Sequence, residues 1–298
     1  MKAGFWSIEG GSAPTRPQHQ GIAAEAQGFR CGLCFRRCRL REGEIGFCGV
    51  RGVENGDFVS PLLGRFCSLA IDPIEKKPLY HWRPGTFILS LGSLGCTMSC
   101  PFCQNHSIAH PEGPVPLADI PPQALAAKAK EMGQSAVAYT YNEPTLQAEY
   151  IIQAAPLLEE AGAKTVLVTN AVMSSQAADD LSRVTAAANI DLKTFSPSRY
   201  AEMGGSLETV KNNVSLMLAR GVHVELTTLV VPGISDDAED FAALVEWAAC
   251  LSPDIPLHIS RYFPAYKYSA PMTGLDLMKR LSTIAAARLR HVHLGNVR

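Results

Sequence analysis

The chain has almost no net charge and no long apolar run. Its 298 residues contain 27 Lys and Arg against 28 Asp and Glu, a formal net charge of -1. Such a balance gives no overall attraction to nucleic acid or to an anionic membrane surface. No window approaches the roughly 18 apolar residues of a membrane span, and the first ten residues lack the apolar stretch of a secretory signal. We therefore expect a cytoplasmic protein that binds neither membrane nor nucleic acid.

Disulfide bonds are also not expected, because they are rare in the reducing cytosol. The chain nevertheless has nine cysteines, and seven of them lie at short mutual spacings. Such spacing favours metal ligation over disulfide formation. The remaining two, Cys67 and Cys250, stand alone and are expected to be buried thiols.

Composition divides the chain into three parts. Residues 1–28 are rich in Gly, Pro, Gln and Ala without periodicity, which predicts a weakly ordered arm. Residues 29–61 form a Cys-rich segment with no helical or strand period, of the kind that a bound metal holds together. Residues 62–298 form the main domain.

In the main domain, β-branched apolar runs alternate with amphipathic stretches rich in Ala and Leu, as in βα units around parallel strands. The predicted strands cover residues 87–91, 136–141, 165–169, 188–192, 222–231 and 257–263. The predicted helices cover residues 123–132, 145–161, 176–184, 207–220, 237–251 and 274–290. Six units are fewer than the eight of a closed barrel. The pattern thus predicts an α/β fold, a partial (β/α)6 TIM-like barrel, with a doubly wound sheet as the alternative.

Three cysteines, Cys96, Cys100 and Cys103, follow the first predicted strand at CxxxCxxC spacing. Four thiolates close an electron-transfer cluster, whereas three leave one iron open to a further ligand. A zinc site completed by His106 or His110 is the alternative. Position favours the cluster, because the loop leaves the C-terminal end of a barrel strand, where catalytic sites are built.

This spacing, with Phe102 before the last cysteine, resembles the radical S-adenosylmethionine (SAM) superfamily. The segment DPIEKKPLYHWRPG at 72–85, with Cys-Gln-Asn at 103–105, is similar to the radical SAM protein of the AmmeMemoRadiSam system, which is related to pyruvate formate-lyase activating enzymes. The resemblance covers about residues 29–298. It implies an oxidoreductase whose [4Fe-4S] cluster cleaves SAM to a 5′-deoxyadenosyl radical, with an electron donor such as flavodoxin or ferredoxin.

The resemblance also implies two SAM contacts early in the domain. Phe102 would offer an aromatic surface to the adenine. The second predicted strand ends in Asn142-Glu143-Pro144, where many family members have Gly-Gly-Glu-Pro. Glu143 would accept a hydrogen bond from the SAM ammonium. A helix cap is the structural alternative for Asn142 and Glu143.

Further SAM contacts are implied at the later strands. Asn170 and Lys193 would face the ribose hydroxyls and the SAM carboxylate, and His258 would reach the ribose. Each has a structural alternative: a turn for Asn170, an ion pair with Asp191 for Lys193, and a packing role for His258. Thr227 stands where related activating enzymes often have Arg, which leaves a backbone contact there.

Four more cysteines lie in the Cys-rich segment, and all are expected to bind metal: Cys31, Cys34, Cys38 and Cys48. Tetrathiolate zinc and an auxiliary [4Fe-4S] cluster are both reasonable for this set. The spacing does not choose between them.

The substrate, a small molecule or a protein, is not indicated by the residues. The segment at 72–85 favours a substrate within an AmmeMemoRadiSam-type system; hydrogen abstraction from a glycyl-radical enzyme is the alternative. A non-catalytic metal-binding interaction protein is a third hypothesis. A polar aromatic patch before the first strand is expected either to contact substrate or partner or to pack at the strand entry: Lys76, Lys77, Tyr80, His81 and Trp82.

Overall fold

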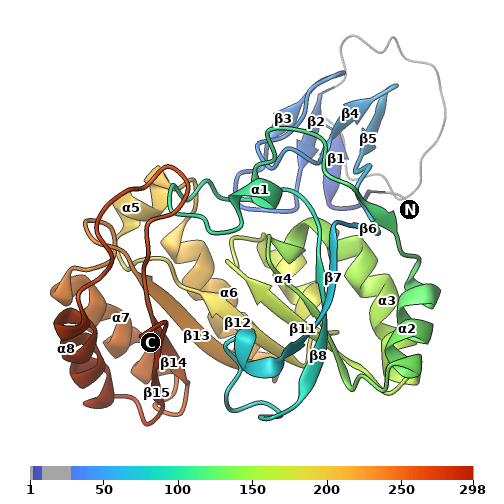
Figure 1. The fold of residues 1–298 in the computed structure, drawn as a ribbon. Coiled ribbons are helices and arrows are strands. Elements are labelled where there is room, and N and C mark those ends of the chain that lie inside the picture. The colour runs from blue at the N-terminus through green and yellow to red at the C-terminus, as the bar shows by residue number, and fades with distance from the viewer. Residues whose placement is uncertain (1–2, 9–27, 298) are drawn as a thin grey trace.

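The computed structural model describes residues 3–8 and 28–297, and its main body is a curved sheet with helices along its outer face (Figure 1). The sheet has the order β15-β14-β13-β12-β11-β10-β8-β7. Its strands are β7 (Ser68–Pro73), β8 (Phe87–Gly92), β10 (Ala136–Tyr139), β11 (Lys164–Thr169), β12 (Ala187–Asp191), β13 (His223–Val230), β14 (Leu257–Arg261) and β15 (Val292–Gly295). All neighbours pair in parallel except β7, which runs antiparallel to β8.

One long helix follows each parallel strand before the next begins. These are α2 (Pro122–Glu131), α3 (Ala148–Glu160), α4 (Ser175–Ser182), α6 (Leu207–Ala219), α7 (Ala238–Leu251) and α8 (Leu275–Ala286). The six βα units confirm the predicted α/β fold, and the edge strands β7 and β15 do not pair with each other, so the barrel stays open. The prediction missed both edge strands. The doubly wound alternative is wrong, because the strand order follows the chain from β8 to β15 without reversal.

Local sequence explains these elements. Strand β10 reads Ala-Val-Ala-Tyr and is buried throughout, as expected for a parallel strand covered on both faces. Helices α4 and α6 begin after Ser174 and Ser206, whose side chains accept hydrogen bonds from backbone N–H groups three residues later. Asp237 caps α7 in the same way.

The segment between β7 and β8 closes the end of the sheet where the parallel strands begin. It contains the short helix η1 (Ile74–Lys76). Ile74 and Leu79 are fully buried in a small core with Ile88 and Ala136, which lie at the starts of β8 and β10. Part of the motif at 72–85 is therefore a packing element.

Short strands form the N-terminal region, at the end of the sheet where the parallel strands terminate (Figure 1). They are β1 (Trp6–Ile8), β2 (Phe29–Cys31), β3 (Arg39–Leu40), β4 (Gly52–Glu54) and β5 (Asp57–Val59). Most of the predicted arm lies outside the described residues, but Trp6–Ile8 forms a strand that pairs with β2. Arg51 ties this region to α3 through a buried ion pair with Glu149, with Nη1 to Oε1 at 2.8 Å.

Among the described residues, no helix has the length and apolar character needed to cross a membrane.

The two isolated cysteines differ in exposure. Cys67 is half-buried, and Cys250 is exposed on α7, so the prediction of a buried thiol at Cys250 was wrong. Cys250 lies at the penultimate position of its helix, where the side chain faces solvent.

Candidate functional site

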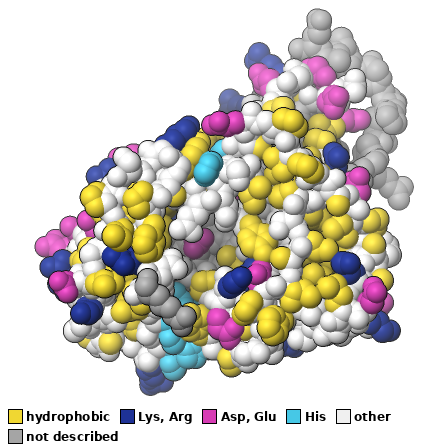
Figure 2. Space-filling model, in the orientation of Figure 1, with side chains coloured by type: hydrophobic (Ala, Val, Ile, Leu, Met, Phe, Trp, Pro, Cys, Tyr) yellow, Lys and Arg dark blue, Asp and Glu magenta, His cyan; other side chains and the backbone are white. Residues whose placement is uncertain are grey.

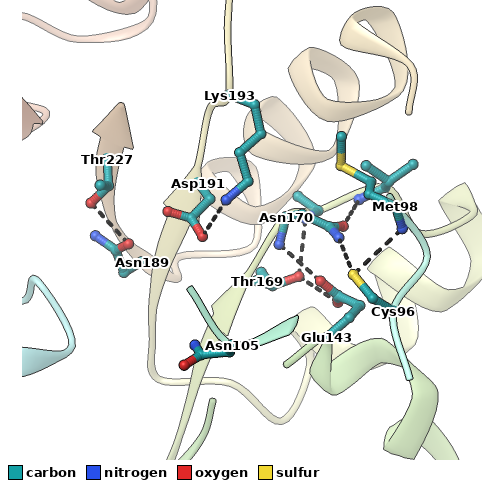
Figure 3. A network of polar contacts seen from close by, with 12 residues as sticks. Cys96, Met98, Asn105, Glu143, Thr169, Asn170, Asn189, Asp191, Lys193 and Thr227 are labelled. Atoms are coloured by element: carbon teal, nitrogen blue, oxygen red, sulfur yellow. Dashed lines mark hydrogen bonds and ion pairs between the residues drawn. The ribbon is translucent and has the colours of Figure 1, made fainter. Parts of the chain in front are cut away.

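Three thiols from one loop line a cavity of about 300 Å³ at the ends of the parallel strands. They belong to Cys96, Cys100 and Cys103, in the loop after β8. The same cavity is lined by Glu143, Asn170, Asp191 and Lys193, which follow or end successive strands of the sheet (Figure 3). The structure thus brings together residues separated by about a hundred positions in the chain, at the edge where α/β folds build their sites.

Backbone contacts hold the cysteine loop on several sides. Gly95 donates from its N–H to the Ile108 carbonyl at 2.9 Å, and Ser99 donates to the Met203 carbonyl at 2.8 Å. Gly95 has φ +88°, and a Cβ there would lie 2.6 Å from the Cys48 carbonyl oxygen. Only glycine fits this close approach to the N-terminal region.

Burial makes the thiols hard to ionise without a partner. It raises the pKa of Cys100 to about 11, although the ammonium of Lys193 lowers it. Burial also raises the pKa values of Cys96 and Cys103. Because thiolates are the form that binds metal, a positively charged group bound here would stabilise them.

Glu143 is the most heavily bonded carboxylate of the cavity. Oε1 accepts hydrogen bonds from Thr145 N at 3.0 Å, from Thr169 Oγ1 at 2.7 Å and from the Thr145 hydroxyl. Oε2 accepts one, from Asn170 N at 2.9 Å, which leaves it free to accept another. Burial raises its pKa, and these hydrogen bonds offset part of the shift. Glu143 caps the short helix η2 (Pro144–Gln147), as the helix-cap alternative predicted, and it also lines the cavity.

Two asparagines brace the cysteine loop. Asn170 donates from Nδ2 to Thr97 Oγ1 at 3.0 Å and lies 3.7 Å from Cys96 Sγ (Figure 3). The Asn142 amide accepts from Ser93 N at 3.0 Å and donates to the Gly95 carbonyl at 3.0 Å. Both line the cavity, and both position the loop.

Lys193 forms an ion pair with Asp191, which was the structural alternative to a contact with the SAM carboxylate. Its Nζ lies 2.9 Å from Asp191 Oδ2, at the end of β12 (Figure 3). Burial disfavours the charged amine, but the Asp191 carboxylate and the nearby Cys100 sulfur outweigh it and raise the pKa of Lys193. The ammonium is therefore held as a fixed positive charge on the cavity wall. Phe102, which is buried, also lines the cavity.

His258 is not among the residues that line the cavity. Its Nε2 lies 2.7 Å from Glu225 Oε2, and its ring packs edge-on against Tyr80, with ring centroids 4.6 Å apart. It belongs to a group of histidines with His81 and His293. Histidine side chains gather on the face of the molecule shown in Figure 2. This geometry gives no support to the expected ribose contact.

Tyr141 is one of the polar residues of the cavity that sequence reasoning missed. Tyr141 has φ +71° and donates from its hydroxyl to Asp72 Oδ2 at 2.5 Å. Lys77, whose side chain is 2% exposed, bonds the same oxygen at 2.7 Å and lies 4.3 Å from the Tyr141 ring centroid. Lys76, Lys77 and Tyr141 all line the cavity, so the segment at 72–85 reaches the site. The sequence signal that could have indicated this contact is the Asp-Pro-Ile-Glu-Lys-Lys run.

A second and smaller cavity is lined by the four cysteines of the N-terminal region, Cys31, Cys34, Cys38 and Cys48. Across the described residues, no three Cys, His, Asp or Glu side chains are arranged around one point as ligands of a single metal ion. His106, one partner of the zinc alternative, stacks on Tyr266 with ring centroids 4.6 Å apart.

Comparison with known protein families decides the identity of this arrangement. The family model described as the radical SAM superfamily matches residues 91–248, more than half of the chain. The chain belongs to the radical SAM superfamily. The matched range includes the cysteine loop and the polar strand ends of the cavity.

Similar proteins extend this assignment. An uncharacterized protein of Methanocaldococcus jannaschii is 34% identical over 272 residues, which cover 90% of this chain and 81% of that protein. The crystal structure of Streptococcus suis SuiB bound to S-adenosylmethionine has a TM-score of 0.55 and 18% identity, over 70% of this chain and 51% of SuiB. A radical SAM methyltransferase from Sphaerobacter thermophilus has a TM-score of 0.50 and 15% identity, over 72% and 67% of the two chains. At these identities the structures show a shared fold.

Superfamily membership makes this radical SAM protein an enzyme of SAM-dependent radical chemistry, with a [4Fe-4S] cluster and SAM as cofactors. The hypothesis of a non-catalytic interaction protein is therefore wrong. The residues present fit both cofactors, because three thiols and no fourth line a cavity that also offers a carboxylate oxygen able to accept a further hydrogen bond and a fixed ammonium. Its volume of about 300 Å³ falls in the range of small-molecule sites.

Proposed function

We propose that Cys96, Cys100 and Cys103 ligate three irons of the [4Fe-4S] cluster, and that SAM binds the fourth iron. The observation that carries this is the convergence of the three thiols with Glu143 and Lys193 on one cavity. When bound, the cluster and SAM supply one-electron reductive cleavage to a 5′-deoxyadenosyl radical that abstracts hydrogen from substrate, with an electron from a donor such as flavodoxin or ferredoxin.

The chain's own residues orient SAM and exclude water. Glu143 Oε2 has room for one more hydrogen bond and suits the SAM ammonium, while Lys193 offers its charge to the SAM carboxylate. Asn170 acts through the loop, since its amide bonds Thr97 and approaches the Cys96 sulfur. Phe102 supplies an apolar surface on which the adenine can lie.

Anaerobic reconstitution followed by reaction with dithionite and SAM tests this function. The wild-type protein is expected to form 5′-deoxyadenosine, and a variant with Ala at Cys96, Cys100 and Cys103 is expected to form none. Cys250→Ala, which removes an exposed thiol far from both cavities in the sequence, is the matched control and should behave as wild type. Failure of fully loaded wild-type protein to form 5′-deoxyadenosine contradicts the proposal.

We propose further that the substrate belongs to an AmmeMemoRadiSam-type system. The segment at 72–85, which carries that resemblance, contributes Lys76 and Lys77 to the cavity wall and so lies where it can contact a substrate. The alternative is activation of a glycyl-radical enzyme. Incubation with candidate glycyl-radical enzymes under reducing, oxygen-free conditions separates the two by electron paramagnetic resonance. A stoichiometric, SAM-dependent glycyl signal supports the alternative and overturns this proposal.

A further inference from the structure

The four N-terminal cysteines line one cavity although they come from different parts of the N-terminal region. Cys31 ends β2, and its N–H donates to the Cys38 carbonyl at 2.9 Å. Cys34 precedes a tight turn in which Arg37 N donates to the Cys34 carbonyl at 3.2 Å. Cys48 lies within a second turn, closed by a 2.9 Å hydrogen bond from Gly49 N to the Gly46 carbonyl. Four cysteines that line one small cavity are a ligand set that a tetrathiolate zinc site can use.

The cavity that these cysteines line is far smaller than the radical SAM cavity. Its volume is about 10 Å³, against about 300 Å³ for the radical SAM cavity. A volume near 10 Å³ holds about one water molecule. A [4Fe-4S] cluster adds four irons and four sulfides, whereas a zinc ion adds one atom. The walls between the cysteines are apolar, with Leu33, Leu40 and Leu146.

Two arginines on the same cavity have nitrogen donors without partners. Arg51 is 1% exposed; its Nη1 bonds Glu149 at 2.8 Å and its Nη2 bonds the Gly4 carbonyl, but its Nε has no hydrogen-bond partner. Arg36 bonds the Gly204 carbonyl through Nη2 at 2.9 Å, and its buried Nε also has no partner. Buried donors left without an acceptor are costly and point to a ligand. Both arginines line the same cavity as the four cysteines, whose sulfurs can accept hydrogen bonds as thiolates.

We propose that Cys31, Cys34, Cys38 and Cys48 bind one structural zinc ion as a tetrathiolate. Arg36 and Arg51 then donate N–H groups to the sulfurs, and the Arg36 charge offsets part of the negative charge that four thiolates leave on a zinc centre. No three of the described ligand-type side chains already surround a single point, so zinc draws the sulfurs inward by side-chain rotation to about 3.8 Å from one another. A tetrathiolate site is closed, which suits a structural role.

The site is tested in a variant that lacks the other metal centre, with Ala at Cys96, Cys100 and Cys103. After anaerobic purification with zinc and iron both supplied, we expect one zinc per chain and neither iron nor acid-labile sulfide. Replacement by Co²⁺ should give sulfur-to-cobalt charge-transfer bands and the intense visible bands of tetrahedral coordination. Iron with sulfide in this variant, or no bound metal, overturns the proposal. The test does not depend on SAM cleavage.

Two arginine variants test the buried donors. Arg36→Lys keeps the charge but removes the Nε donor, and loss of such a supporting group weakens metal affinity by about 10-fold or more. Arg37→Lys is the matched control, because Arg37 is the exposed next residue and does not line the cavity. Zinc affinity is measured by competition with a chromophoric chelator in the same triple-Ala background. Equal affinities for the two variants would remove Arg36 from the site.

Discussion

Replacement of Glu143 by Gln isolates the charge that we assign to the SAM ammonium. Glu143 is 2% exposed, and its Oε2 accepts one hydrogen bond within the chain. A hydrogen bond to a charged partner contributes about 1.5–3 kcal/mol. At 1.4 kcal/mol for each factor of ten, Glu143→Gln should weaken SAM binding roughly 10- to 150-fold.

The same substitution disturbs the internal bonds of the site. If the new amide nitrogen replaces Oε2, it faces the N–H of Asn170, a donor against a donor. If it replaces Oε1, it faces the N–H of Thr145. Either arrangement leaves one buried donor unsatisfied, which costs about 1–3 kcal/mol of folding free energy. A modest fall in melting temperature should therefore accompany the loss of affinity.

Calorimetric titration of SAM into the reconstituted, oxidised protein measures the effect. Glu160→Gln, at the exposed end of α3, is the control and should bind SAM as wild type does. Because burial raises the pKa of Glu143 and the ammonium needs the ionised carboxylate, wild-type affinity should fall as the pH drops through that raised pKa. This pH dependence should vanish in Glu143→Gln. Equal SAM affinity for Glu143→Gln and wild type, at equal cluster loading, would refute the assignment.

Two further substitutions test the support of the site. Gly95→Ala places a Cβ 2.6 Å from the Cys48 carbonyl at φ +88°, so we expect the iron content after reconstitution to fall well below that of Gly113→Ala, where a Cβ meets no atom within 4 Å. Asp72→Asn leaves Lys77 buried without its ion pair and should cost about 3 kcal/mol in chemical denaturation. Lys77 and Tyr141 outweigh burial and hold the pKa of Asp72 well below its usual range, so its stabilisation is present above about pH 4 and is lost as the pH falls through the folded pKa. Wild-type stability that does not change with acid over this window would contradict the role of Asp72.

The parallel strands and their helices could be predicted because each carries its own local signal, an apolar run or an amphipathic period. The edge strands carry a weaker signal. Strand β7 alternates half-buried and exposed positions over most of its length, and β15 has four residues that are all half-buried. Pairing with a neighbour in the sheet, which no local pattern encodes, defines both as strands.

The residues of the site likewise divide into those that a local sequence signal indicates and those that only the fold brings together. The cysteine loop is a local motif, and Glu143 lies at a strand end that the pattern could place. Tyr141 meets Asp72 across 69 positions of sequence, and only the fold brings them together. His258 shares a strand face with Ser260, which lines the cavity, but two residues span about 6.6 Å along a strand. His258 therefore lies nearer the start of β14 than Ser260, where its ring packs against Tyr80.

The most direct test of the central claim is the electron paramagnetic resonance spectrum of the dithionite-reduced protein, recorded with and without SAM. An iron left open by three thiolates must change its ligands when SAM binds, so the cluster signal of wild-type protein should change on SAM addition. The variant with Ala at Cys96, Cys100 and Cys103 should show no such signal and no cluster iron. Iron, acid-labile sulfide and spectrum all unchanged by the three substitutions would contradict the account.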